Sequence, residues 1–248
     1  MSDNPLKEYY RSVKRYTEIP SDGILYADGV IEMPSTGEVP IYAMTARDEM
    51  VMRNPDALLN GEAVAQVISS CVPCVQDARQ LISPDVDTLM VAIQGATYGD
   101  VVKVEAECPE CGNTTQGAAS IDHALNTLTK LPQDLSLELD SGLIINLRPV
   151  SYETTVRAGV TSFQSTRSLQ AIAQIEDEME QIRAFDASYK RMAELNFEIL
   201  VDSVNSIQGL DDQGEPFVVQ DRNNIREFLE NCDNTVGKQI TQKVDEMS

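Results

Sequence analysis

The spacing of apolar positions along the chain changes near residue 150. Before it, short runs of alternating apolar residues, which predict β-strands, are interleaved with stretches of helical spacing. After it, residues 152–206 contain almost no Pro or Gly, and apolar residues recur every three or four positions, which predicts two or three helices. The pattern predicts an α+β chain of three parts: an extended N-terminal β arm at 1–44, a small α/β module with β-hairpins at 45–150, and a helical C-terminal region at 151–248.

The predicted arm contains two β-type runs, at 23–33 and 37–44, separated by a Pro-Ser-Thr-Gly turn. Few residues of these runs could form a core unaided. We therefore expect them either to pair as a hairpin or to lie on a partner.

Local start and stop signals place the helices of the module. Thr45 and Asp48 are spaced as a capping box, and Asn54-Pro55 places proline at a first helical position. A third start at 83–85 is followed by apolar residues at helical spacing as far as Tyr98-Gly99. Three helices are expected from these signals.

Two β-hairpins and a set of C-terminal helices complete the prediction. The runs 101–107 and 114–120 are expected to pair, and so are the two halves of 135–150, which turn at 140–142. The segment 209–216 is expected to be a loop. One C-terminal helix is predicted from Leu169, Ile172, Ile175, Met179 and Ile182, and the last helix from a stripe that needs a partner: Ile225, Phe228, Leu229, Cys232, Val236, Ile240, Val244 and Met247.

Four of the five cysteines form two Cys-x-x-Cys pairs, Cys71 with Cys74 and Cys108 with Cys111. Two such pairs supply the four ligands of a tetrahedral zinc site. Their separation exceeds the roughly 15–20 residues usual in a zinc ribbon, but the helix expected between them could bring its ends together. We therefore expect one structural zinc ion, which would fasten the first helices to the hairpin at 101–120. A site of four thiolates also accepts iron.

The cysteines also allow interpretations other than a zinc site. Some could be buried free thiols, since cysteine is among the most buried residues. Cys71 and Cys74 could instead serve a thiol–disulfide oxidoreductase, although their pair closes a predicted helix and a thioredoxin-type pair opens one. His123, the one histidine, could replace a cysteine ligand, and Cys232 is expected in the core.

The charge balance of the chain disfavours one class of function, the binding of nucleic acid. The chain has 19 Lys and Arg against 40 Asp and Glu, a formal net charge of −21. Such a surface repels a phosphate backbone, so a zinc-ribbon adaptor for nucleic acid is disfavoured. The sequence shows neither an export signal nor a membrane span, and an odd number of cysteines suits a reducing cytosol.

The sequence shows no catalytic constellation. It contains neither a Gly-x-Ser-x-Gly elbow nor a phosphate-binding glycine motif. The carboxylates within 175–181 are best explained as a solvated helix face. We expect a protein that is not an enzyme and has no small-molecule substrate.

Residues 41–61 contain Met-Thr-Ala-Arg-Asp-Glu followed by Asn-Pro-Asp-Ala-Leu-Leu-Asn-Gly. These motifs, in this order, resemble the T4-type bacteriophage baseplate protein family, which includes baseplate hub assembly proteins. The resemblance continues through Ile-Ser-Ser-Cys-Val, Ala-Thr-Tyr-Gly, Cys-Pro-Glu-Cys-Gly and Ile-Asn-Leu-Arg-Pro-Val-Ser-Tyr, covering about residues 20–150 and more loosely the rest.

The resemblance implies a structural or assembly protein of the hub of a contractile tail, made in the bacterial host's cytoplasm and placed in the virion. Its partners would be other hub or wedge proteins, with docking expected through residues 1–44 and the stripe at 221–247. The family supplies no catalytic residues, and the matched Asn54, Pro55 and Asp56 already have a role as a helix start.

Overall fold

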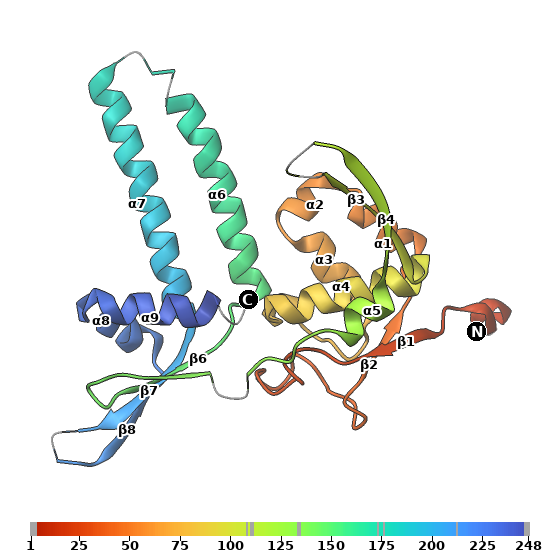
Figure 1. Cartoon of the computed structure of the whole chain (residues 1–248), viewed down its shortest axis with the longest axis horizontal. Coiled ribbons are helices and arrows are strands. Elements are labelled where there is room, and N and C mark those ends of the chain that lie inside the picture. The colour runs from red at the N-terminus through yellow and green to blue at the C-terminus, as the bar shows by residue number, and fades with distance from the viewer. Residues whose placement is uncertain are drawn as a thin grey trace. The chain divides into compact units, whose positions relative to one another are not determined.

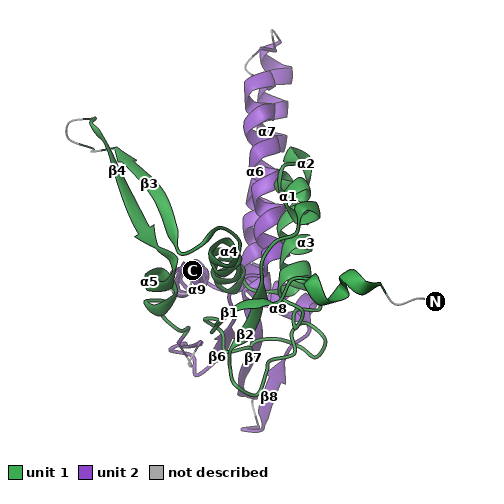
Figure 2. Cartoon of the chain, turned by 90° about the vertical axis from the view of Figure 1, so that its right-hand side faces the viewer, with its two compact units in different colours: residues 1–131 green, residues 132–248 purple. Residues whose placement is uncertain are grey.

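The structure is a computed structural model that describes residues 4–107, 109, 112–132, 135–172, 174–175, 177–211 and 213–245. The chain forms two compact units, Met1–Leu131 and Pro132–Ser248, coloured separately in Figure 2. The sequence pattern had suggested a change at residue 150. The division lies earlier because the predicted hairpin at 135–150 belongs to a sheet that is completed by strands after residue 203.

Unit 1 combines α-helices with two separate two-stranded sheets, one formed by residues 13–17 and 39–42 and one by residues 101–107 and 114–120 (Figure 1). Strand β1 (Val13–Thr17) pairs antiparallel with β2 (Val39–Tyr42). The helices, in chain order, are α1 (Ala46–Met52), α2 (Pro55–Leu59), α3 (Glu62–Cys71), α4 (Ser83–Tyr98) and α5 (Ile121–Asn126), with short 3-10 helices at Pro5–Tyr9 and Ala78–Gln80. The core lies between α3 and α4, where Val67, Ile68, Leu89 and Ile93 are fully buried.

The prediction for the N-terminal arm is corrected. The run 23–33 does not pair with 37–44; β2 pairs instead with β1, a polar strand whose sequence, Val-Lys-Arg-Tyr-Thr, lacks the alternation that would reveal it. Ile19, Val39 and Ile41 are buried within the unit. Residues from 17 to 41 therefore contribute to the core of this chain.

A buried carboxylate holds the long loop between β1 and β2. Asp85, in the first turn of α4, is fully buried and accepts hydrogen bonds from Tyr26 Oη at 2.6 Å, the Ser21 amide at 3.0 Å and the Ser21 hydroxyl. Burial raises the pKa of Asp85, while these hydrogen bonds oppose the rise. The loop is thus tied to the start of α4.

The starts at Thr45 and Asn54 and the stop at Gly99 are confirmed, whereas the helix expected from Asn54 to Cys71 is two helices, α2 and α3, and Ser83 does not cap α4. Thr45 accepts from the Asp48 amide, Asp48 accepts from the Thr45 amide, and Asn54 caps α2 with Pro55 at its first position. Helix α4 ends at Gly99, whose φ of +96° favours glycine. The predicted hairpin at 101–120 is also present, as β3 (Val101–Glu107) and β4 (Thr114–Ser120), in seven antiparallel pairs.

Unit 2 combines a four-stranded antiparallel sheet with a long helical hairpin. Its elements are β5 (Ser136–Glu138), β6 (Ile144–Leu147), α6 (Tyr152–Ile172), α7 (Glu178–Asp202), β7 (Val204–Leu210), β8 (Pro216–Val219), α8 (Arg222–Asn231) and α9 (Asn234–Asp245). The strand order is β5-β6-β7-β8. The helical hairpin of α6 and α7 leaves the sheet after β6 and returns to it at β7, as Figure 1 shows.

Three predictions for the C-terminal region are corrected. The region is not wholly helical, because 204–210 and 216–219 are strands, and they overlap both ends of the loop expected at 209–216. The apolar residues predicted as one helix are divided: Leu169 and Ile172 lie in α6, Ile175 lies in the connection, and Met179 and Ile182 lie in α7, which Asp177 caps by accepting from the Glu180 amide. The predicted last helix is also divided into two, α8 and α9. Its apolar stripe packs within unit 2, because Ile225, Leu229 and Ile240 are buried there.

The fold class is therefore mixed, with small antiparallel sheets and a largely helical C-terminal part, as the sequence predicted in outline. Among the described residues, no helix combines the length and the apolar character needed to cross a membrane.

Candidate functional site

The first cysteine pair lies at the end of α3. Cys71 is the last residue of that helix and is fully buried, and Arg11 Nη1 donates to its Sγ at 3.7 Å. Cys74 lies in the following turn, half-buried, with its backbone carbonyl accepting from the Glu32 amide at 2.8 Å. Both thiols thus lie where α3 meets the N-terminal segment.

Burial raises the pKa of both Cys71 and Cys74. Near Cys71, Asp48 raises it further, and Arg11 lowers it. A reactive thiol–disulfide pair needs a depressed thiol pKa and solvent access. The environment of this pair therefore offers no support for the oxidoreductase reading.

The second pair, Cys108 and Cys111, lies outside the described residues, so the predicted four-cysteine site is not tested by the structure. The strands that flank the pair are described, and their ladder runs from Val101↔Ser120 to Glu107↔Thr114. Figure 2 shows this ribbon projecting from unit 1 away from α1, α2 and α3. A site that uses all four cysteines requires the end of the ribbon to approach the end of α3.

No group of three or more metal-ligating side chains occurs within the described residues, which include only two of the four proposed ligands. His123 is exposed on α5, and Cys232, half-buried, follows the last turn of α8.

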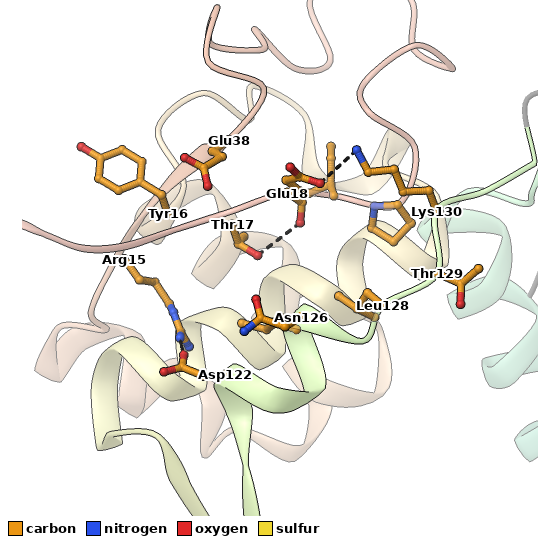
Figure 3. Close-up of a pocket in the computed structure, with 13 residues that line it drawn as sticks. Arg15, Tyr16, Thr17, Glu18, Glu38, Asp122, Asn126, Leu128, Thr129 and Lys130 are labelled. Carbon is orange, nitrogen blue, oxygen red and sulfur yellow. Dashed lines mark hydrogen bonds and ion pairs between the residues drawn. The ribbon is translucent and has the colours of Figure 1, made fainter.

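A pocket of about 320 Å³ lies between the β1 region and α5 in unit 1 (Figure 3). Four of its charged groups form ion pairs: Arg15 with Asp122, and Lys130 with Glu18 at 2.9 Å. Its described lining contains no cysteine, histidine or serine that could act as a nucleophile. The lining of the pocket is mainly polar and charged.

The base of the α6–α7 hairpin is held by charged side chains. Asp202, at the end of α7, binds Arg157 of α6 and Arg222 of α8, each at 2.8 Å. Glu198, one turn earlier, binds Arg222 and Arg226. Hydrogen bonds from Arg222 and Arg226 lower the pKa of Glu198. This network fastens the hairpin to α8 at its base.

The far half of the same hairpin carries large apolar side chains in contact with solvent: Phe163, Leu169, Met179, Ile182, Phe185 and Tyr189, each between 43% and 67% exposed. The sequence pattern had identified Leu169, Met179 and Ile182 as one apolar face but had not indicated Phe185 or Tyr189. Their spacing from Ile182, at three and seven positions, was the signal available.

Comparison with known proteins gave one match. A family model described as T4 bacteriophage base plate protein matches residues 28–248, most of the chain. No curated protein and no solved structure matched.

Proposed function

Because the chain belongs to the T4 bacteriophage base plate protein family, it is a baseplate structural protein, and we propose that it builds or assembles the hub of a contractile tail. It would act by docking to other hub or wedge proteins, without catalysis. It would be made in the cytoplasm of the bacterial host and placed in the tail baseplate of the virion. The family match over residues 28–248 carries this proposal.

The burial of side chains changes which surfaces we propose for docking. Ile19 and Ile41 in the N-terminal segment, and Ile225 and Ile240 in the stripe of α8 and α9, are buried within the chain and are therefore not available for docking. The N-terminal segment before them still exposes Leu6, Tyr9, Tyr10 and Tyr16, each at 60% or more. Aromatic side chains of this kind are enriched at protein interfaces, so this segment keeps its proposed role in docking.

We also propose that Cys71, Cys74, Cys108 and Cys111 hold one structural zinc ion. The support is the ligand count and the bite of each Cys-x-x-Cys pair. The ion would supply no chemistry beyond holding the ribbon to α3. It would stiffen a two-stranded ribbon that is only marginally stable alone.

The proposed function is tested with two phage strains: one in which this gene is deleted, and one in which the deletion is complemented by the chain supplied separately. We expect the deletion to stop baseplate assembly, seen by electron microscopy, and the complementing chain to restore it. Mass spectrometry of purified virions then separates a retained component from an assembly factor that leaves. Normal baseplates in the deletion would refute the proposal.

A deletion of residues 1–10, which precede β1 and include the exposed Leu6, Tyr9 and Tyr10, tests the docking segment in the complementing chain. We expect the shortened protein to remain folded by circular dichroism but to lose co-purification with other baseplate proteins. Undiminished co-purification would remove the segment from the docking surface.

A further inference from the structure

The outer half of the α6–α7 hairpin has its small polar residues inside and its large apolar residues outside. Between residues 155 and 194, the only buried residues that the structure describes are Ser165 and Ser188. On the outside, Leu169, Ile182 and Phe185 are 43%, 56% and 55% exposed. Two helices in contact along serines gain little from hydrophobic burial. The distribution indicates that this part of the hairpin is completed by another molecule.

We define an apolar flank of the hairpin as Leu169, Ile172, Ile182, Phe185 and Tyr189, of which Ile172 is half-buried and the other four are exposed. A cavity of about 430 Å³ lies between the two helices and is lined by Leu169, Ile172, Gln181, Ile182 and Phe185. This volume lies within the range of sites that enclose apolar ligand groups. The flank is therefore a groove with an apolar floor.

The spacing of the flank fits a helix. Ile182, Phe185 and Tyr189 are three and then four positions apart, so they lie on one side of α7 over about 10 Å. A helix laid along such a groove inserts side chains at the same spacing, whereas an added strand needs an open sheet edge. The geometry favours an α-helical occupant.

The helical occupant could be a second copy of this chain or a different protein, and the charge near the flank decides which of the two is favoured. The flank borders the first turns of α7, where residues 177–183 carry three carboxylates, of Asp177, Glu178 and Glu180, and one guanidinium, of Arg183. A second copy would bring the same acidic turns and another net charge of −21. A helix with basic flanks would instead meet complementary charge.

We propose that this flank docks an amphipathic α-helix of a partner protein, with an apolar ridge bordered by Lys or Arg. The proposal rests on the proposed function, since it names the chemistry of one partner in the baseplate. The ridge would fill the cavity between α6 and α7, and its basic side chains would lie near Glu178 and Glu180.

Designed helical peptides and the full chain provide the test. One peptide has a leucine ridge with lysine borders, a second has glutamate in place of lysine, and a third has serine in place of leucine. Fluorescence anisotropy at physiological salt measures their affinity. We expect the leucine–lysine peptide to bind at least about tenfold more tightly than either of the others, since both apolar and charge complementarity contribute.

Two variants locate the binding. Phe185→Ser is expected to lower the affinity of the leucine–lysine peptide by at least about tenfold. Leu210→Ser, which changes a 68% exposed residue at the end of β7, is the matched control and should leave the affinity within about twofold. Circular dichroism verifies that both variants fold.

Four outcomes would overturn the inference: no binding of the leucine–lysine peptide, equal binding of the glutamate peptide, an unchanged affinity in Phe185→Ser, or dimers in sedimentation velocity that Phe185→Ser dissociates. If one of these occurs while the protein is still required for baseplate assembly, the proposed function stands and only this docking site falls.

Discussion

The backbone carbonyl of Asp202 accepts a hydrogen bond from Arg148 Nε at 2.9 Å, although 54 positions separate the two residues. Next to it, the Arg148 amide donates to the Ser203 carbonyl at 2.9 Å. The chain thus leaves the sheet and returns to it at one point. The carboxylate of Asp202 also binds Arg157 and Arg222 there, so one acidic side chain joins α6, α7 and α8.

Asp202→Ala is expected to lower the free energy of unfolding by about 1–2 kcal/mol, because two arginines lose a carboxylate whose side chain is only 16% exposed. Urea unfolding followed by circular dichroism measures the change. The control is Asp186→Ala, which removes an exposed pair with Lys190 and should cost less than about 0.5 kcal/mol. Equal costs for the two variants would show that the base of the hairpin does not depend on Asp202.

Glu198 should make the stability of the protein depend on pH. Hydrogen bonds from Arg222 and Arg226 lower its pKa in the folded state below its usual 4.5. Its contribution is therefore complete above the unfolded pKa and is lost as the pH falls through the folded pKa. We expect Glu198→Gln to unfold at a lower temperature than the parent at pH 7.

The difference in midpoint temperature between Glu198→Gln and the parent should be smaller at pH 3 than at pH 7, because Glu198 loses its charge as the pH falls. Thermal unfolding by circular dichroism at the two pH values measures it. A difference that stays constant would mean that the charge of Glu198 does not contribute.

Two helical glycines should respond to alanine in opposite directions. A Cβ at Gly159 in α6 would meet no atom within 4 Å, so Gly159→Ala should stabilise by about 0.5–1 kcal/mol. A Cβ at Gly95 in α4 would collide with the Arg15 guanidinium and lie 2.9 Å from Ile121 Cγ2. We expect Gly95→Ala to destabilise by about 1 kcal/mol in chemical unfolding. Stabilisation by both would disprove the close approach of α4 to Arg15 and α5.

Zinc content tests the four-cysteine proposal. Protein purified without chelator should contain about one equivalent by mass spectrometry, and both Cys74→Ser and Cys108→Ser should lose it. Cys232→Ser, which changes a half-buried cysteine outside the proposed site, should keep it. Zinc removal should also lower amide protection in β3 and β4, because a two-stranded ribbon is marginal by itself. If the native protein contains no metal and the thiols of all four proposed ligands react with a thiol reagent, the proposal is wrong.

The sequence predicted best what depends on neighbours along the chain. The caps at Thr45 and Asn54, the stop at Gly99 and the turn at Gly142 were all visible, since each is decided by a few adjacent residues. The pairing of β3 with β4 followed for the same reason.

Long-range pairing could not be predicted. Strand β7 continues the apolar spacing of α7 through Val204 and Ile207, and only its pairing with β6 decides that it is extended. The buried Asp85 was visible only as part of a helix start, because its partner Tyr26 lies 59 positions away. The docking flank was partly visible as apolar spacing, but exposure is a property of the folded hairpin.

The helical hairpin of α6 and α7 is inserted between β6 and β7, which are neighbours in the sheet. The length of the hairpin therefore does not affect how these strands pair. Pairing of Leu147 with Val204 closes the insertion, so whole turns can be added to or removed from α6 and α7 without a change in strand register. Seven residues in each helix correspond to about 10 Å of reach. The length of the hairpin can therefore change while the sheet beneath it stays the same.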